Sequence, residues 1–257
     1  MDRVRRAAVK LDIVTIFPRM VEAPLAEGIV GRAIGRGVLD VRVHDLRGHT
    51  TDRHRVVDDV PFGGGPGMVL KPEPLFRAVE AIRAGRGEPS AVVLTSPDGP
   101  RLSHAVAERL SRLDHIVILC GRYEGVDERV RLHLATEEIS IGDYVLSGGE
   151  LPALVILDAL ARFVPGVVGD EGSVAGDSFA RGVLDFAQYT RPADFRGWTV
   201  PPVLLSGNHA EIERWRRKDA LKRTLDRRPD LVADGSGLSP EDRALLQELL
   251  ETREKGA

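Results

Sequence analysis

Short apolar runs alternate with amphipathic segments through the first half of the chain. Strands are predicted where β-branched and aliphatic residues cluster, at Leu11–Phe17, Leu39–Asp45, Ala91–Thr95 and His115–Cys120. Helices are predicted where apolar residues recur with helical spacing, over Pro24–Gly35, Pro72–Ala84, Ser103–Leu113 and Val126–His133. Pro24 and Pro72 suit a first helical turn, and Ser103 suits an N-cap position. This alternation predicts an α/β fold with a parallel sheet covered on both faces.

The second half of the chain contains one long apolar helix followed by a segment without periodicity. We expect the helix over Leu151–Phe163, whereas Val164–Phe179 holds four glycines, a proline and scattered acids. Such a long irregular segment is typical of a linker or a functional lid. Beyond it, Asn208 predicts the cap of a helix running to about Leu225, and Ser239-Pro240 predicts the start of another. We therefore expect an α/β domain over 1–163, a flexible linker over 164–179 and a small helical domain over 180–257.

The composition of the chain argues against several classes of protein. The chain has 257 residues, of which 42% are hydrophobic and 29% charged, which is enough apolar material for a packed core. Its single cysteine, Cys120, excludes internal disulfides and multi-cysteine metal sites, and it favours a cytoplasmic location. The longest apolar stretch contains Asp158, Arg162 and Pro165, so it predicts a buried helix rather than a membrane span. We expect neither a membrane partner nor an export signal.

Charge is unevenly distributed although the net charge is only −3. Residues 137–177 hold eight acids and one base, whereas residues 211–228 hold eight bases and four acids. The first residues, 2–10, add a net charge of +3. An acidic centre with basic ends fits a protein that holds a polyanion at its edges. The basic run alone also fits the solvated face of an ordinary helix.

Three glycine-bearing turns follow predicted strands, at Ser96–Gly99, Gly121–Gly125 and Ile141–Glu150. Ligands bind outside the carboxyl ends of strands in open α/β sheets, and glycine lets a ligand approach the backbone closely. Any one of these turns fits an ordinary connection. Three together, with Tyr123 and Tyr144 among them, indicate one small-ligand site.

The motifs of several common ligand sites are missing from the sequence. No G-x-G-x-x-G opens a helix after the first strand, and Gly63–Lys71 lacks the lysine position and the Ser or Thr of a phosphate loop. The histidines form no H-E-x-x-H motif, which argues against zinc, and no G-x-S-x-G nucleophile turn occurs. The expected ligand is therefore one held largely by backbone contacts.

Five longer strings follow one another in a fixed order: His54–Asp59, Phe62–Met68, Cys120–Arg129, Ser140–Pro152 and Pro201–Ile212. Together they resemble the bacterial tRNA (guanine-N1)-methyltransferase family, which belongs to the SPOUT class. The resemblance extends from about Leu11 to beyond Arg228. It implies a deep trefoil knot in the C-terminal part of the α/β domain, an obligate homodimer and S-adenosylmethionine as methyl donor.

The resemblance implies that three knotted loops grip the donor mostly through backbone atoms. The matching positions are Thr95, Ser96 and Pro97 in the first loop; Gly121, Tyr123, Glu124 and Gly125 in the second; and Ser140, Ile141, Gly142, Tyr144, Val145, Leu146, Gly148, Gly149 and Pro152 in the third. These loops include the three glycine-bearing turns.

The resemblance also implies a catalytic pair. Asp177 matches the general base that removes the proton from guanine N1, and Arg162 matches the cation that stabilises the charge developing on O6. Without the resemblance, Asp177 would be read as a loop acid or helix cap, and Arg162 as a partner of Asp158. The implied acceptor is guanosine at tRNA position 37, preceded by another guanine. The donor lies in one subunit and the aspartate comes from the other.

Contacts to tRNA are implied at two places. His54 and Asp58 match a stretch that helps to read the guanines, and Arg214, Arg217 and Lys218 are candidate phosphate contacts; no DNA partner is implied. The family depends on magnesium, but the sequence shows no carboxylate cage; Glu124 and Asp177 are candidates for water-mediated contact with the ion. We expect Val168–Asp177 to be mobile without ligands and to order when donor and tRNA bind.

Two other functions remain open. One is a SPOUT-class methyltransferase that modifies another RNA base or a ribose 2′-hydroxyl, although the Asp177–Arg162 pair argues against a ribose oxygen. The other is a non-catalytic RNA-binding protein that uses the basic C-terminal helix. Mapping the methyl group on digested tRNA tests the first, and titration with S-adenosylmethionine tests the second.

Overall fold

The computed structural model of the protein describes residues 8–169, 176–235 and 237–255. The chain divides into two compact units, Met1–Gly169 and Asp170–Ala257. The expected ordering of Val168–Asp177 concerns mainly residues 170–175, which lie outside the described part. In the described residues, no helix is both long enough and apolar enough to cross a membrane.

The first unit is built on a parallel sheet of five strands in the order β2-β1-β6-β5-β7. The strands are β1 (Val9–Thr15), β2 (Leu39–Asp45), β5 (Ala91–Thr95), β6 (His115–Cys120) and β7 (Glu137–Ile139). Every residue of β5 and β6 is buried, as expected for central strands covered on both faces. The predicted α/β class with a parallel sheet is confirmed.

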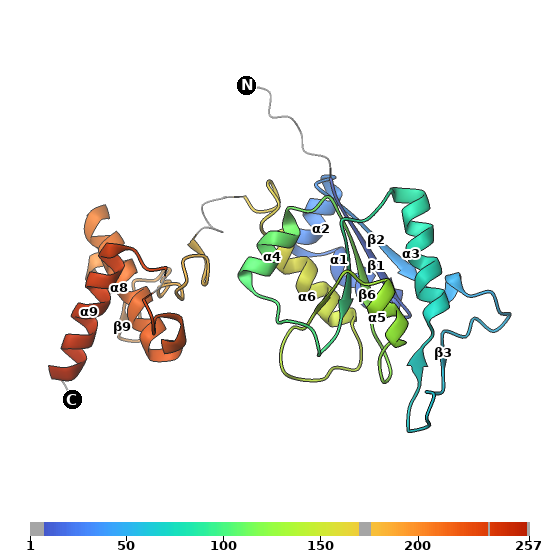
Figure 1. Cartoon of the computed structure of the whole chain (residues 1–257). Helices are drawn as coiled ribbons and strands as arrows, with labels where there is room; N and C mark the ends of the chain where they lie inside the picture. The colour runs from blue at the N-terminus through green and yellow to red at the C-terminus, as the bar shows by residue number, and fades with distance from the viewer. Residues whose placement is uncertain (1–7, 170–175, 236, 256–257) are drawn as a thin grey trace. The chain divides into compact units, whose positions relative to one another are not determined.

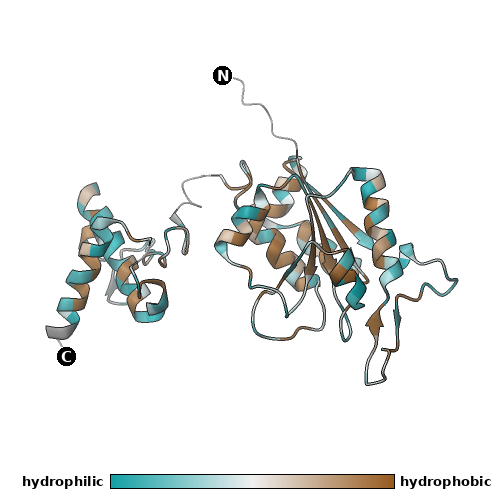
Figure 2. Cartoon of the chain, viewed as in Figure 1, coloured by the Kyte–Doolittle hydropathy of each residue, from teal (hydrophilic) through white to brown (hydrophobic). Residues whose placement is uncertain are grey.

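Helices cover both faces of this sheet (Figure 1). One face carries α1 (Pro18–Leu25), α2 (Gly28–Gly35), α4 (His104–Ser111) and α6 (Glu150–Ala161), whose buried residues form one core with alternate strand residues. The other face carries α3 (Pro72–Arg86) and α5 (Glu128–His133), which form a second core. The apolar colour follows the strands and one side of each helix (Figure 2).

Two shorter features complete the first unit. The 3-10 helix η1 (Leu46–His49) follows β2, and a small antiparallel hairpin then pairs β3 (Asp58–Asp59) with β4 (Val69–Leu70). This hairpin extends away from the sheet (Figure 1). The hairpin and β7 were not predicted, because two or three residues carry no readable periodicity.

The second unit contains two packed helices, α8 (His209–Arg227) and α9 (Pro240–Lys255). Leu221 of α8 packs with Val232, Leu238 and Leu246 in a small apolar core. Shorter elements surround these helices: β8 (Asp194–Phe195), β9 (Trp198–Thr199), η2 (Pro202–Leu205) and η3 (Pro229–Leu231). Asn208 caps α8 and the Ser239 hydroxyl accepts a 3.0 Å hydrogen bond from Asp242 N, so both predicted caps are confirmed.

Several predicted element boundaries differ from the structure by one or more residues. Pro24 does not open a helix; it lies inside α1, and α2 begins separately at Gly28. Pro18 occupies the first turn of α1 instead. Gly28, the first residue of α2, has a φ of 65°, and this left-handed conformation interrupts the helical path from α1 to α2. The first strand runs over Val9–Thr15 rather than to Phe17, and the helix predicted from Val126 begins at Glu128, after the Asp127 cap.

Candidate functional site

Three loops meet at one edge of the parallel sheet. They follow β5, β6 and β7, which are neighbours in the sheet and all point their carboxyl ends the same way. The strand order therefore brings residues 96–102, 121–127 and 140–149 together. Loops at this edge are the usual ligand-binding position in open α/β folds.

Hydrogen bonds between the loops fix their spacing. Leu102 N donates to the Ser140 carbonyl at 2.7 Å, which joins the first loop to the third. Gly149 N donates to the Gly121 carbonyl at 2.8 Å, which joins the third loop to the second. Within the third loop, Gly142 N donates to the Ser140 hydroxyl at 3.2 Å. The loops thus form one connected backbone frame.

Gly149 shows how closely this frame is packed. A Cβ added there would lie 2.8 Å from Cys120 Cα and 2.9 Å from Gly121 N, which are backbone atoms that cannot move aside cheaply. Only glycine fits where the third loop crosses the end of β6. Burial raises the pKa of the Cys120 thiol beside it well above the usual range, so this cysteine packs as an apolar residue.

The loops enclose a pocket of about 400 Å³. Every position that the resemblance assigns to the donor lines it: Thr95, Ser96, Pro97, Gly121, Tyr123, Glu124, Gly125, Ser140, Ile141, Gly142, Tyr144, Val145, Leu146, Gly148, Gly149 and Pro152. The sequence reasoning did not single out the other lining residues, which are Leu94, Asp98, Arg122, Val126, Glu128, Arg131, Glu138, Ile139 and Ser147.

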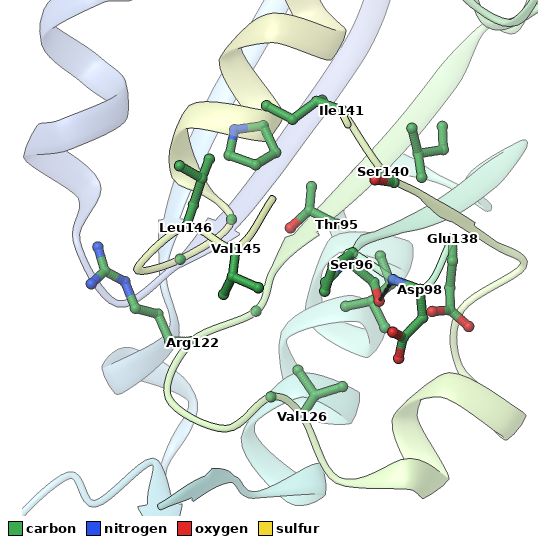
Figure 3. A pocket seen from close by; sticks show the side chains of 18 of the residues that line it. Thr95, Ser96, Asp98, Arg122, Val126, Glu138, Ser140, Ile141, Val145 and Leu146 are labelled. Atoms are coloured by element: carbon green, nitrogen blue, oxygen red, sulfur yellow. Dashed lines mark hydrogen bonds between the residues drawn. The ribbon is translucent and has the colours of Figure 1, made fainter. Parts of the chain in front are cut away.

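The pocket has an acidic side and an apolar side (Figure 3). Ser96, Asp98 and Glu138 lie on one side, and Val145 and Leu146 lie on the other. The acids suit a ligand that carries positive charge and hydroxyl groups, whereas the aliphatic side chains and the glycine backbone suit a flat ring. Asp98 lies within the predicted Ser96–Gly99 turn, so its position in the sequence was the signal that could have identified it.

Arg122 connects the second loop to α6 and β1. Its Nε lies 3.2 Å from Glu150 Oε2, and Glu150 also accepts a 2.7 Å hydrogen bond from the Thr15 hydroxyl. Glu150 is 1% exposed, so this carboxylate needs both donors. The guanidinium also lies 4.4 Å from the centre of the Phe17 ring. No local pattern indicates this arrangement, because Thr15 and Glu150 are far apart in the sequence.

The two residues of the implied catalytic pair lie in different units. Arg162 follows the last turn of α6 in the first unit, and Asp177 lies in the second unit; both are half-buried. Arg162 therefore shares its unit with the pocket, and Asp177 does not. His54 and Asp58 both lie in the first unit, in the hairpin region that precedes α3.

The implied phosphate contacts on α8 have partners on α9. Arg214 and Lys218 pair with Glu248, at 3.3 and 2.6 Å, and Arg217 pairs with Glu241. These pairs join the two helices at an exposed face. Phosphate groups would therefore have to compete with carboxylates for the three cations. Among the described residues, no cluster of three or more His, Cys, Asp or Glu side chains could hold a metal ion.

Comparison with known proteins identifies the family. The family described as "tRNA (Guanine-1)-methyltransferase TrmD" matches residues 9–234. The chain belongs to the TrmD family. Several proteins named tRNA (guanine-N(1)-)-methyltransferase are similar to it over nearly their whole length. Those of Geobacter metallireducens, Geobacter sulfurreducens and Dehalococcoides mccartyi are 52%, 55% and 51% identical, covering 96%, 92% and 94% of this chain and 100%, 96% and 97% of their own.

Membership of the TrmD family indicates which ligand the pocket should be compared with. A methyltransferase of this family implies S-adenosylmethionine as methyl donor. The residues present fit that molecule, because the glycine frame leaves room for a purine ring against backbone and the acidic side suits a donor with positive charge. The matched range includes all three pocket loops together with Arg162 and Asp177.

Proposed function

We propose that this TrmD-family protein transfers a methyl group from S-adenosylmethionine to N1 of guanosine 37 in tRNA, next to the anticodon. The observation that carries the proposal is the pocket itself. Three glycine-bearing loops at the ends of adjacent parallel strands line it, and so does every position that the resemblance assigns to the donor. Because the acceptor is tRNA, we expect the protein to work in the cytoplasm.

The chemistry of guanine defines what the side chains must do. N1 carries a proton at neutral pH, so it is a poor nucleophile until a base removes that proton. In our proposal the Asp177 carboxylate accepts the proton, and the Arg162 guanidinium stabilises the negative charge that spreads to O6. When bound, S-adenosylmethionine supplies an electrophilic methyl group. The pocket loops hold the reacting groups in line, which contributes much of the acceleration.

We further propose the SPOUT-class trefoil knot and a small helical C-terminal domain. Support for the knot comes from the path of the third loop. After β7 at the sheet edge, the chain returns across the ends of β5 and β6, where Gly149 packs against Thr95 and Cys120. It then enters α6, whose first residue, Glu150, reaches Thr15 of β1. Support for the domain comes from the packed pair α8 and α9.

The active unit in our proposal is a homodimer with the site at the subunit interface. An interface would place Asp177 of one subunit beside the donor pocket of its partner. Met20 on α1 and Leu151 and Val155 on α6 are 40%, 51% and 44% exposed, and these two helices pack together in the first unit. Apolar side chains gathered on neighbouring helices offer area for a second copy.

The proposal also includes a requirement for magnesium and a set of residues that contact tRNA. We expect magnesium to be required, with Glu124 and Asp177 as candidates for water-mediated contact. Arg214, Arg217 and Lys218 would contact tRNA phosphates, and His54 and Asp58 would approach the guanines. Phosphate contacts predict an affinity that falls steeply as salt rises.

Methylation of a tRNA transcript by Asp177→Asn tests the mechanism. We expect transfer to slow by about 10²–10⁴-fold, because the amide cannot accept the N1 proton, while the affinity for S-adenosylmethionine stays the same. Glu80→Gln, which neutralises an exposed carboxylate on α3, is the control and should keep full activity. Undiminished transfer by Asp177→Asn would refute the assigned base, and a methyl group mapped to a ribose or another base would refute the assigned reaction.

A further inference from the structure

Phe62 is the most exposed large apolar side chain of the described residues. It stands at the tip of the β3–β4 hairpin and is fully exposed, and Val60 beside it is 69% exposed. An apolar ring left in water is unfavourable, so a ring held there indicates contact with a partner molecule. The pocket and the proposed catalytic pair do not account for it.

The base of this hairpin is rigid. Val57 and Leu70 are both fully buried, and Lys71 N donates to the Val57 carbonyl at 2.8 Å. These contacts hold the two arms of the hairpin in the core beneath α3. The tip, residues 60–68, therefore projects from a fixed support, and the position of Phe62 is tied to the fold.

The hairpin is also hydrogen-bonded to the second pocket loop. Glu124 N donates to the Met68 carbonyl at 3.0 Å, and Leu70 N donates to the Gly125 carbonyl at 3.0 Å. Gly67 lies so close to this loop that an added Cβ would sit 2.6 Å from Glu124 Cγ. A molecule bound by the tip is therefore held at a defined position relative to the second pocket loop.

The surroundings of the ring favour a nucleic acid. Gly63, Gly64 and Gly65 follow Phe62 in the left-handed region, and a Cβ added to any of them would meet nothing within 4 Å. The segment after the ring thus leaves open space for a flat partner. Arg53 and Arg55, in the loop before β3, are both exposed and supply positive charge near the same hairpin. An exposed aromatic ring, on a hairpin whose preceding segment carries positive charge, is typical of surfaces that bind unpaired bases of RNA.

We propose that Phe62 stacks on an unpaired base of the tRNA loop that carries the target guanine. The hairpin tip would thereby hold that loop in place above the donor pocket. Phe62 is a positioning residue in this proposal, which rests on the proposed function. A second copy of the chain is a poorer occupant, because Phe62 and Val60 offer far less area than the roughly 800 Å² per partner of a stable interface.

Three variants of Phe62 test the proposal on the full-length protein with a tRNA transcript. Phe62→Ala should raise the KM for tRNA by about 5- to 150-fold, since stacking on one base is worth about 1–3 kcal/mol. Phe62→Trp should retain the wild-type KM because it keeps a ring, whereas Phe62→Leu should behave like Phe62→Ala. Val60→Ala removes an exposed apolar side chain from the same tip and should leave the KM unchanged.

Two further measurements separate stacking from a structural role. The affinity for S-adenosylmethionine, by calorimetry, and the melting temperature should be the same in wild type and all variants. An unchanged tRNA KM in Phe62→Ala, or a full rescue by Phe62→Leu, would overturn the proposal. So would a Phe62→Ala protein that changes its oligomeric state. If the wild type failed to methylate guanine N1, the proposed function would fall instead, so the two failures are distinguishable.

Discussion

Asp12 is a fully buried carboxylate in the middle of β1. Its oxygens lie 2.6 Å from His44 Nε2 on β2, 2.8 Å from His115 Nε2 on β6 and 2.8 Å from Arg86 Nε on α3. Burial alone would raise the pKa of Asp12, but the hydrogen bonds from both histidines and the charge of Arg86 outweigh it and hold the pKa below its usual range. One side chain therefore ties three strands and a helix together.

This network predicts acid sensitivity. Because the pKa of Asp12 is lower in the folded protein than in the unfolded chain, its contribution to stability is complete above pH about 4–5 and is lost as the pH falls through the folded value. Asp12→Asn should cost about 3 kcal/mol or more at pH 7, because it breaks a buried charged network. Its free energy of unfolding should also fall less steeply than that of the wild type between pH 5 and 3.

Urea unfolding at a series of pH values measures both effects. Asp158→Asn, at an exposed carboxylate, is the control and should follow the wild-type curve. Parallel curves for wild type and Asp12→Asn below pH 5 would contradict the linkage.

Single residues differ in how well the sequence revealed them. Gly149, Tyr123 and Ser140 stand in strings long enough to be matched to a family, and all three line the pocket. Arg122 stands in one of the same strings, but its role depends on Glu150 and Thr15, which only the fold brings to it. Its partners could not be read from the sequence because they lie on other elements.

For helix α8, too, the sequence revealed the local features but not the partners that lie on another element. Its start and its Asn208 cap followed from local signals, because capping and helical spacing are properties of neighbouring residues. Its end lies at Arg227 rather than near the predicted Leu225. The partners of its cations did not, since Glu248 and Glu241 belong to α9. The pKa of Glu248 is lowered by its hydrogen bond with Lys218, so this carboxylate stays charged and continues to compete with phosphates.

Neutralising Glu248 should release two cations for tRNA. With Glu248→Gln, Arg214 and Lys218 lose their shared carboxylate, and we expect tRNA binding at low salt to tighten by about two- to tenfold, with a steeper dependence on salt. Filter binding over a series of KCl concentrations measures this. Glu251→Gln makes the same charge change on α9, at a carboxylate that accepts a 3.3 Å hydrogen bond from Gln247 Nε2. Equal tightening in both variants would mean that only net charge matters and that Arg214 and Lys218 do not contact phosphate.

The residues of the proposed site are distributed over both units of the chain. The pocket belongs to the first unit and Asp177 to the second, so the catalytic site that we propose would need residues from both units. In the proposed homodimer, the pocket of one subunit takes Asp177 from the other. This arrangement predicts that two inactive proteins can complement each other.

Co-expression of two variants tests this assembly. Asp177→Asn keeps the pocket, and Ser96→Trp fills the pocket but keeps Asp177. A mixed dimer, isolated with two different tags, should recover about half of the wild-type activity, because one of its two sites is intact. A mixed dimer of Asp177→Asn with the Ser96→Trp/Asp177→Asn double variant should stay inactive. An inactive Asp177→Asn and Ser96→Trp pair, shown to be dimeric, would place both parts of the site in one chain.

The amino-acid sequence was enough to predict the alternation of strands and helices and the caps at Asn208 and Ser239. It also contains the motifs that resemble the family and include the pocket loops. These features depend on neighbours in sequence, which is why they can be read from it. The strand order β2-β1-β6-β5-β7, the pairing of Arg122 with Glu150 and the anchoring of the β3–β4 hairpin to the second pocket loop arise from contacts between distant segments. Such contacts form only when all the elements pack together, because burial and hydrogen bonding across the core select one arrangement among many that the local pattern allows.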